Sequence, residues 1–386
     1  MFDPIVIVAA RRTPMGGFQG ALSKLTASQL GSAAIRAALD DAGLPGEAID
    51  RGVIGCVLGA GQGQAPARQA LLGAGLPQSV AAVTVNKMCG SGMQAAIDAH
   101  DALLAGSADI AVAGGMESMT SAPYLLPKAR GGFRMGHGEI KDSMFLDGLE
   151  DAYEPGRLMG SFAEDCARDY QFTRTAQDEW AIRSTTRAQA AIAGGAFDAE
   201  VVAVGEVAHD EQPGKARLDK IPTLKPAFAH DGTVTAANAS SISDGAAALI
   251  LMRESTAKAH GLAPLARILG HAVHAQAPSA FATAPGPAIR KLLEKTGLAV
   301  GGIDLWEINE AFAVVPMAAV RDLGLDEAKV NVNGGACALG HPIGASGARI
   351  LVTLLHALRA RGGGTGVASL CIGGGEATAM AIETFT

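Results

Sequence analysis

The sequence predicts an α/β protein made of two similar halves, and two observations carry that prediction. Short β-branched, apolar segments alternate with Ala- and Leu-rich segments of helical periodicity. In addition, a pattern between residues 34 and 54 recurs between residues 288 and 308, always 254 positions further along. The matching positions in the first copy are Ala34, Ile35, Arg36, Leu39, Gly43, Leu44, Ile49, Asp50 and Ile54. We therefore expect two βαβ-type halves of layered sheets and helices, each a mostly parallel sheet covered by helices.

The first half contains the clearest signals for individual elements. Residues 5–10 form an apolar run that is typical of a buried strand, and a helix is expected after it. The start of this helix is indicated by the capping-box pair Thr26 and Gln29, and its end by Gly43. The other elements expected in this half are strands at 52–58, 81–85 and 109–113 and a helix from the turn near residue 89 to about Leu104. In the second half, residues 368–376 resemble residues 110–117 and suggest an equivalent closing strand.

A segment of different composition separates the two halves. It contains a run rich in methionine, glycine and charge, followed by an expected helix over 175–193. The cations Lys128, Arg130 and Arg134 of this segment could meet a phosphate or a partner subunit, and a solvated surface explains them equally well. The expected division is an N-terminal half at 1–118, completed by about 249–262, a loop-domain insertion at 119–248, and a C-terminal half at 263–386.

Composition excludes several classes of function. A net charge of -7 argues against general binding to nucleic acid or to a membrane surface. The first four residues lack a signal-peptide pattern, and no stretch reaches about 18 uninterrupted, strongly apolar residues. Cys56, Cys89, Cys166, Cys337 and Cys371 are widely spaced without a C-x-x-C pair, which suggests neither a disulfide framework nor a zinc site. We therefore expect a cytoplasmic protein with free thiols and no metal.

Cys89 is the first candidate for a reactive residue. It stands between an apolar run and an Ala-rich segment, where the N-terminus of a helix can lower a thiol pKa that is ordinarily roughly 8.5. Gly90 and Gly92 would let a substrate carbonyl approach the sulfur. A small buried hydrophobe is the plainer interpretation of this cysteine. Residues 90–95 also fit the dinucleotide pattern G-x-G-x-x-A, although Asp109 precedes the next strand and is misplaced for a ribose.

Three more polar residues occupy similar junctions in the second half. His341 lies in a glycine-rich turn ahead of an expected helix through Leu354 and Leu358. Cys371 and Asn309 each stand at the end of an expected strand. Because α/β folds place their sites at such junctions, we expect these three residues and Cys89 to meet.

Four motifs resemble the thiolase family, and the resemblance covers essentially the whole chain. They are residues 86–92 around the cysteine, 309–312, 340–342 and 371–375. The resemblance implies a thiolase fold with a central loop domain. Ketoacyl synthases share the double fold but pair their cysteine with two histidines, and Cys371 in this position points to a thiolase instead.

The resemblance also implies roles for the site residues. Cys89 would carry an acyl group as a thioester, with His341 activating it. Cys371 would move the α-proton, and Asn309 would act through a water. The backbone N–H groups of Cys89 and Gly373 would form an oxyanion hole. The expected reaction joins two acetyl-CoA into acetoacetyl-CoA and CoA, or runs in reverse, with CoA thioesters as substrates and no cofactor.

The pocket and the assembly are further expectations from the resemblance. The positions matching the pantetheine and acyl tunnel are Leu149, Met159, Ala236, Ser240, Phe281, Ala311 and Phe312. Leu158 replaces a histidine common in biosynthetic members, and Phe281 stands where these often have a methionine. A degradative 3-ketoacyl-CoA thiolase of broader chain length is therefore the alternative within the family. Residues 210–220 should lie near the adenine end. A homotetramer is expected, and a non-catalytic acyl-CoA carrier is the alternative of another class.

Overall fold

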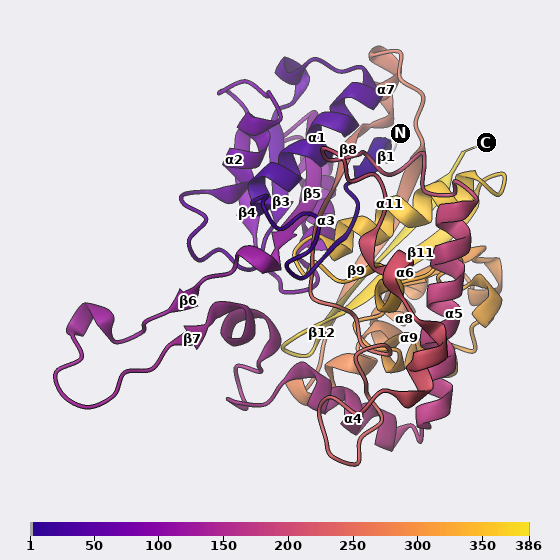
Figure 1. Ribbon diagram of the computed structural model, residues 1–386. Helices are drawn as coiled ribbons and strands as arrows, with labels where there is room; N and C mark the ends of the chain where they lie inside the picture. The colour runs from indigo at the N-terminus through magenta and orange to yellow at the C-terminus, as the bar shows by residue number, and fades with distance from the viewer. Residues whose placement is uncertain (1–2, 386) are drawn as a thin grey trace.

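The computed structural model describes residues 3–385 and contains a ten-stranded mixed sheet surrounded by helices (Figure 1). The strands are β1 Ile5–Arg12, β2 Gly16–Gly17, β3 Arg51–Gly55, β4 Ala81–Val85, β5 Ile110–Ser118, β6 Tyr124–Leu125, β7 Lys141–Asp142, β8 Ser243–Arg253, β9 Ala266–Ala275, β10 Leu305–Ile308, β11 Gly364–Ile372 and β12 Glu376–Thr384. The helices are α1 Ala27–Ala42, α2 Pro66–Gly73, α3 Ser91–Leu104, α4 Met159–Asp169, α5 Arg174–Ala193, α6 Glu211–Lys215, α7 Glu254–Ala259, α8 Pro285–Thr296, α9 Val314–Leu323, α10 Ala336–Leu339 and α11 Ser346–Arg359.

The ten-stranded sheet joins the two halves edge to edge. Its order is β10-β11-β12-β9-β1-β8-β5-β3-β4, with β2 paired to β8, while β6 and β7 form a separate ribbon. The junction is the short antiparallel pairing of Val6 and Ile7 with Arg267 and Ala266. Each half therefore contributes the strands on one side of the β1–β9 pairing, and together they form one continuous sheet.

The expectation of mostly parallel sheets is wrong. In the N-terminal half β3 is parallel to β4 and β5, but β8 is antiparallel to β5 and β1. In the C-terminal half β11 is parallel to β10 and antiparallel to β12. The reason is local, because β11 and β12 are joined by only three residues, a connection too short for a parallel crossover.

The internal repeat is confirmed at the level of element ends. Helix α1 starts with the expected capping box of Thr26 and Gln29 and ends at Gly43, whose φ is 62°. Helix α8 ends in the same way at Gly297, with φ 70°. Glycine adopts this left-handed conformation without steric cost, so both helices stop at the same point of the repeat.

Helices α3 and α11 lie against each other at the centre of the molecule, with side chains buried in one shared core. A Cβ at Gly347 would lie 2.3 Å from the backbone N of Met93, and one at Gly92 would lie 2.7 Å from the N of Ala348. The two helices therefore approach backbone to backbone at their N-terminal ends. That approach brings together the turns that precede them, which hold Cys89 and His341.

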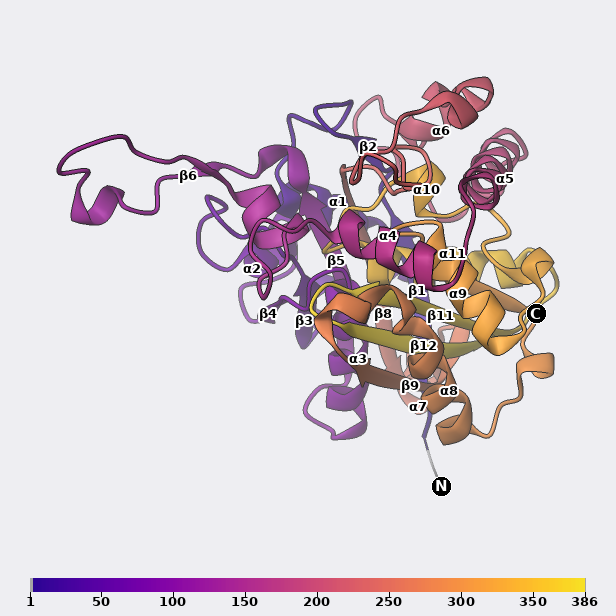
Figure 2. The same ribbon diagram turned by 90° about the horizontal axis from the view of Figure 1, so that it is seen from below.

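The segment between β5 and β8 contains a ribbon that projects from the body and three helices. Strands β6 and β7 begin and end the projecting hairpin at the left of Figure 1, which Figure 2 shows from below. Exposed apolar side chains along it are Tyr124, Leu126, Phe133, Met135 and Ile140. Lys128, Arg130 and Arg134 are also exposed there. None of the helices within residues 3–385 is long and apolar enough to cross a membrane.

Candidate active site

A cavity of about 410 Å³ lies where the central segment meets both halves. Cys89, His341 and Gly373 line it together. All seven positions expected to form the tunnel also line it, namely Leu149, Met159, Ala236, Ser240, Phe281, Ala311 and Phe312. Asn309 and Cys371 are fully buried and lie outside the lining.

The turn that carries Cys89 is held in a strained shape by its own side chains. Met88 has a φ of 46°, which is unfavourable for a residue with a Cβ. Its N–H donates to Asn86 Oδ1 at 3.0 Å, and its carbonyl accepts from Ser91 Oγ at 2.6 Å. Ser91 Oγ in turn accepts the N–H of Lys87 at 2.8 Å. These bonds fix the direction of the cysteine before any substrate arrives.

The glycines beside Cys89 serve packing, and the expectation that they open a path for substrate is wrong. A Cβ at Gly90 would lie 2.3 Å from Ile372 Cδ1, so that side of the turn already contacts the end of β11. Gly92 is equally closed by the backbone of α11. The small residues let the two halves approach, which places Gly373 beside Cys89.

Burial controls the protonation of Cys89. Removal from water raises the pKa of the Cys89 thiol to about 11, although the backbone N–H groups of Gly373 and of Cys89 itself lower it. The expected thiolate is therefore wrong for the resting protein, because desolvation exceeds the effect of the turn. The same two N–H groups remain available to stabilise negative charge that develops beside the sulfur.

His341 is a neutral base with one free nitrogen. Its Nδ1 lies 2.6 Å from Ser346 Oγ, and that hydroxyl donates to the carbonyl of Pro342 at 2.9 Å. Because the serine proton is used there, we assign the imidazole proton to Nδ1. Nε2 has no partner among the described residues. Burial, and next the charge of Arg349, lower the pKa of His341 to about 3.

Asn309 and Cys371 are buried and do not line the cavity. Asn309 follows β10, and neither its Nδ2 nor its Oδ1 has a hydrogen-bond partner among the described residues. An unsatisfied amide of this kind is costly unless a water or ligand joins it. Burial, and next the neighbouring Cys89, raise the pKa of Cys371 well above its usual range. Cys371 is thus a thiol close to Cys89.

Glu117 was not identified from the sequence and holds the loop that follows His341. Its Oε2 accepts the N–H groups of Val57 and Gly344, both at 3.0 Å, and its Oε1 accepts that of Leu58 at 3.2 Å. Burial raises the pKa of Glu117 to about 7. A carboxylate within the apolar run of β5 is the signal that could have revealed it.

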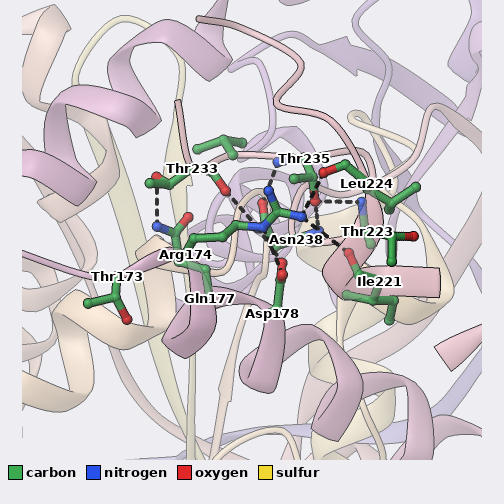
Figure 3. A network of polar contacts seen from close by, with 12 residues as sticks. Thr173, Arg174, Gln177, Asp178, Ile221, Thr223, Leu224, Thr233, Thr235 and Asn238 are labelled. Carbon is green, nitrogen blue, oxygen red and sulfur yellow. Dashed lines mark hydrogen bonds and ion pairs between the residues drawn. The ribbon is translucent and has the colours of Figure 1, made fainter. Parts of the chain in front are cut away.

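Figure 3 shows a polar network that includes Thr235 and Asn238. These residues belong to the same segment as Ala236 and Ser240, which line the cavity. Asp178 of α5 accepts from Arg174 Nε at 2.7 Å and from Asn238 Nδ2 at 3.0 Å. Asn238 Oδ1 accepts the N–H of Thr235 at 2.7 Å. The wall segment is therefore fixed to α5 by charge-assisted bonds rather than by secondary structure of its own.

Aromatic rings close the inner part of the cavity. Phe281 packs edge-to-face against Phe162 and Phe312, with centroids 6.4 and 6.3 Å apart. Leu158 lines the cavity, whereas the preceding Arg157 pairs with Glu154 at 2.8 Å. The replacement of histidine by leucine at position 158 therefore makes the wall apolar.

Comparison with known proteins agrees with this geometry. The family descriptions "Thiolase, N-terminal domain" and "Thiolase, C-terminal domain" match residues 5–255 and 262–384. An acetyl-CoA acetyltransferase of Escherichia coli is 50% identical over 388 residues, covering 98% of each chain. One of Cupriavidus necator is 48% identical, covering 98% of this chain and 99% of its own.

Solved structures agree as well. A thiolase from Ascaris suum in complex with coenzyme A superposes with a TM-score of 0.96 at 44% identity, covering 99% of this chain and 100% of its own. The chain has the thiolase fold, and it belongs to the thiolase family.

Proposed function

We propose that this protein is an acetyl-CoA C-acetyltransferase, which joins two acetyl-CoA into acetoacetyl-CoA and CoA and catalyses the reverse thiolysis. The observation that carries the proposal is one cavity lined by a thiol, Cys89, and by a neutral imidazole, His341, whose Nε2 has no partner among the described residues. The relatives named acetyl-CoA acetyltransferase support the reaction, and the coenzyme A of the Ascaris suum structure supports the substrate class.

Thiolysis begins with acyl transfer to Cys89. His341 Nε2 accepts the thiol proton as the sulfur attacks the 3-keto carbon of acetoacetyl-CoA. The oxyanion accepts hydrogen bonds from the backbone N–H groups of Cys89 and Gly373. A donor of this type stabilises the transition state by about 3 to 4 kcal/mol. The C–C bond then breaks, leaving an acetyl group on Cys89 and the enolate of acetyl-CoA.

The enolate is quenched by Cys371. Because burial keeps Cys371 protonated, its Sγ–H can donate to the enolate carbon, and the imidazolium of His341 restores that proton. Asn309 binds a water that, with His341, holds the enolate oxygen. CoA then attacks the acetyl-cysteine, its thiol proton passing through His341 to Cys89. Condensation is the same sequence reversed, and neither direction needs a cofactor.

A second hollow provides the place for the rest of CoA. It shares the lining residues Ala236 and Ser241 with the cavity, so the two hollows are neighbours. Its lining includes Lys215, Arg217 and Lys220. Cations at the outer end of an apolar tunnel suit a pantetheine chain that ends in phosphates, with the adenine beyond.

The assembly we propose is a homotetramer. Within residues 3–385 the outermost strand, β4, has no neighbour on one side, and its residue Val83 is exposed. An unprotected apolar edge favours pairing with a second copy. The hairpin between β6 and β7 exposes a second apolar surface, which suits contact between dimers. All five cysteines are free, which supports a cytoplasmic location.

Substitution of the two cysteines tests the mechanism. Cys89→Ala should form no acetyl-enzyme with labelled acetyl-CoA, because the nucleophile is absent. Cys371→Ala should still acylate but lose thiolysis and exchange of the α-protons with solvent. Cys166→Ala, a buried thiol outside the cavity lining, is the matched control and should behave as the unmodified enzyme. Normal turnover by either active-site variant would refute the roles given to these residues.

Chain-length preference separates the proposed activity from its alternatives. Thiolysis of acetoacetyl-CoA should exceed that of 3-ketohexanoyl-CoA and 3-ketodecanoyl-CoA in kcat/KM, because Phe281 closes the cavity. Phe281→Leu should shift the ratio toward the longer substrates by roughly tenfold, the scale of one or two methylenes in an apolar pocket. Phe197→Leu is a control, since Phe197 is buried outside this cavity.

Two results would replace the proposal. Equal or better cleavage of the long substrates by the unmodified enzyme would identify a degradative 3-ketoacyl-CoA thiolase. No cleavage of any substrate, with acyl-CoA binding retained, would identify a non-catalytic carrier.

A further inference from the structure

Two histidines and an aspartate form a cluster away from the active site. His100 and Asp101 lie on α3, and His271 lies on β9. His100 Nδ1 is 2.8 Å from Asp101 Oδ1, and His271 Nε2 is 3.0 Å from the same oxygen. The two rings are perpendicular, with centroids 5.0 Å apart. Three donor atoms therefore converge on one point from two elements.

The cluster is separate from the catalytic machinery. His100 is eleven positions beyond Cys89, which corresponds to roughly 16 Å along a helix. None of the three residues lines the cavity or the basic hollow beside it. The cluster connects the helix that follows the nucleophile to a strand of the C-terminal half.

The burial of the three side chains suits an ion site that is open to solvent. The imidazoles of His100 and His271 are only 10% and 13% exposed, whereas the carboxylate of Asp101 is 57% exposed. The rings are thus held by their surroundings, while the carboxylate can turn.

The distances between donors are close to those of a metal site. The three donor atoms lie within 4.8 Å of one another. On a tetrahedral zinc ion with bonds of about 2.0 to 2.2 Å, two donors lie about 3.4 Å apart. A movement of at most about 1.4 Å, with the carboxylate turning aside, therefore creates a tetrahedral arrangement with water as the fourth ligand.

The chemistry of the donors selects the class of ion. Two imidazoles with one carboxylate suit zinc, cobalt or nickel better than magnesium or calcium, which prefer oxygen. The positive charge that would repel a bound cation here is that of Lys295. Its Nζ donates a hydrogen bond to the carbonyl of His271 at 3.2 Å. That bond directs the ammonium to the strand backbone.

We propose that His100, Asp101 and His271 bind a divalent transition-metal ion of the zinc type, linking α3 to β9. No step of acyl transfer depends on this ion. Its effect is to hold the nucleophile's helix against the other half, so bound metal stabilises the folded chain.

Titration with cobalt(II) tests the site, because cobalt replaces zinc and reports its ligands by absorption. We expect one ion per chain, with a spectrum of nitrogen and oxygen ligands and without thiolate charge-transfer bands. His271→Gln and Asp101→Asn should each weaken binding at least tenfold, while His274→Gln on the same strand should bind as the unmodified protein does. Zinc should raise the Tm of the unmodified protein and of His274→Gln only.

Other outcomes would overturn the site. Thiolate bands would assign the ion to the cysteines, and equal binding by His271→Gln would remove the cluster from coordination. The control is the Tm of each variant without metal, which should equal that of the unmodified protein without metal if the substitutions leave the fold intact. The proposed mechanism gives His271 no part in acyl transfer. The thiolysis activity of the variants is therefore measured separately, and metal binding alone decides whether the cluster is an ion site.

Discussion

At the scale of single residues, the site holds its reactive groups neutral. Burial raises the pKa of Cys89 to about 11 and lowers that of His341 to about 3, so neither carries charge at pH 7. Proton transfer between them therefore accompanies the attack on substrate. A resting thiol is also less exposed to oxidation than a thiolate would be.

Alkylation measures this protonation state directly. Iodoacetamide reacts with the thiolate, so the rate at Cys89 should rise continuously between about pH 6 and pH 9, without a plateau below the raised pKa. The rate is followed by mass spectrometry of the Cys89 peptide, with Cys371→Ala used to remove the neighbouring thiol. A rate that is high and flat across neutral pH would instead indicate a thiolate paired with an imidazolium.

Glu117 shows how a residue outside the cavity sets the position of another. It binds the N–H of Gly344, three residues beyond His341, and the N–H groups that follow β3. Those partners are far apart in sequence. No local pattern links them, which is why the resemblance that identified Cys89, His341, Cys371 and Asn309 did not reveal this carboxylate.

At the scale of elements, the crossing of α3 and α11 fixes the distance between the turns that hold Cys89 and His341. The crossing depends on two glycines whose missing side chains let backbones meet. A larger residue there would separate Cys89 from His341 as well as disturb the core.

Gly347→Ala should therefore affect stability and activity together. Its Cβ would meet the N of Met93, and we expect a loss of about 1 to 3 kcal/mol, as for overpacked cores, with a lower Tm and a reduced kcat. Gly301→Ala is the control, because a Cβ there has no atom within 4 Å. Unchanged melting and turnover of Gly347→Ala would show that the helices separate without cost.

At the scale of the whole molecule, the free edge of β4 and the projecting hairpin are the features that a single chain leaves incomplete. Along β4, the N–H of Ala81 and the carbonyl of Val85 bond to the β3 side. Because alternate residues of a strand point their backbone groups the same way, the N–H of Ala82 points to the open edge.

Ala82→Pro should thus disrupt assembly without breaking the sheet. Proline removes the outward N–H, and the expected result by light scattering is loss of the tetramer. Ala82→Val keeps that N–H and should remain assembled. Met135→Glu, at the hairpin, should give dimers only. If the unmodified protein is monomeric at micromolar concentration, the proposed tetramer is wrong.

The sequence by itself determined the elements and the family. Capping residues, glycine stops and apolar periodicity predicted α1, α5, β1 and β4 closely, because these signals act between near neighbours. The repeated pattern predicted two halves for the same reason. Of the residues in the motifs, Cys89 and His341 line one cavity and Cys371 lies near Cys89, whereas the meeting of all four residues, Asn309 included, stays a prediction.

Only the tertiary structure decided the properties that depend on distant neighbours. The antiparallel strands within each half, the packing role of Gly90 and Gly92 and the clamp at Glu117 all arise from contacts between separate parts of the chain. The pKa of Cys89 is the clearest case. A helix N-terminus is visible in sequence and lowers that pKa, but desolvation is the larger effect, and it exists only once the two halves close around the thiol.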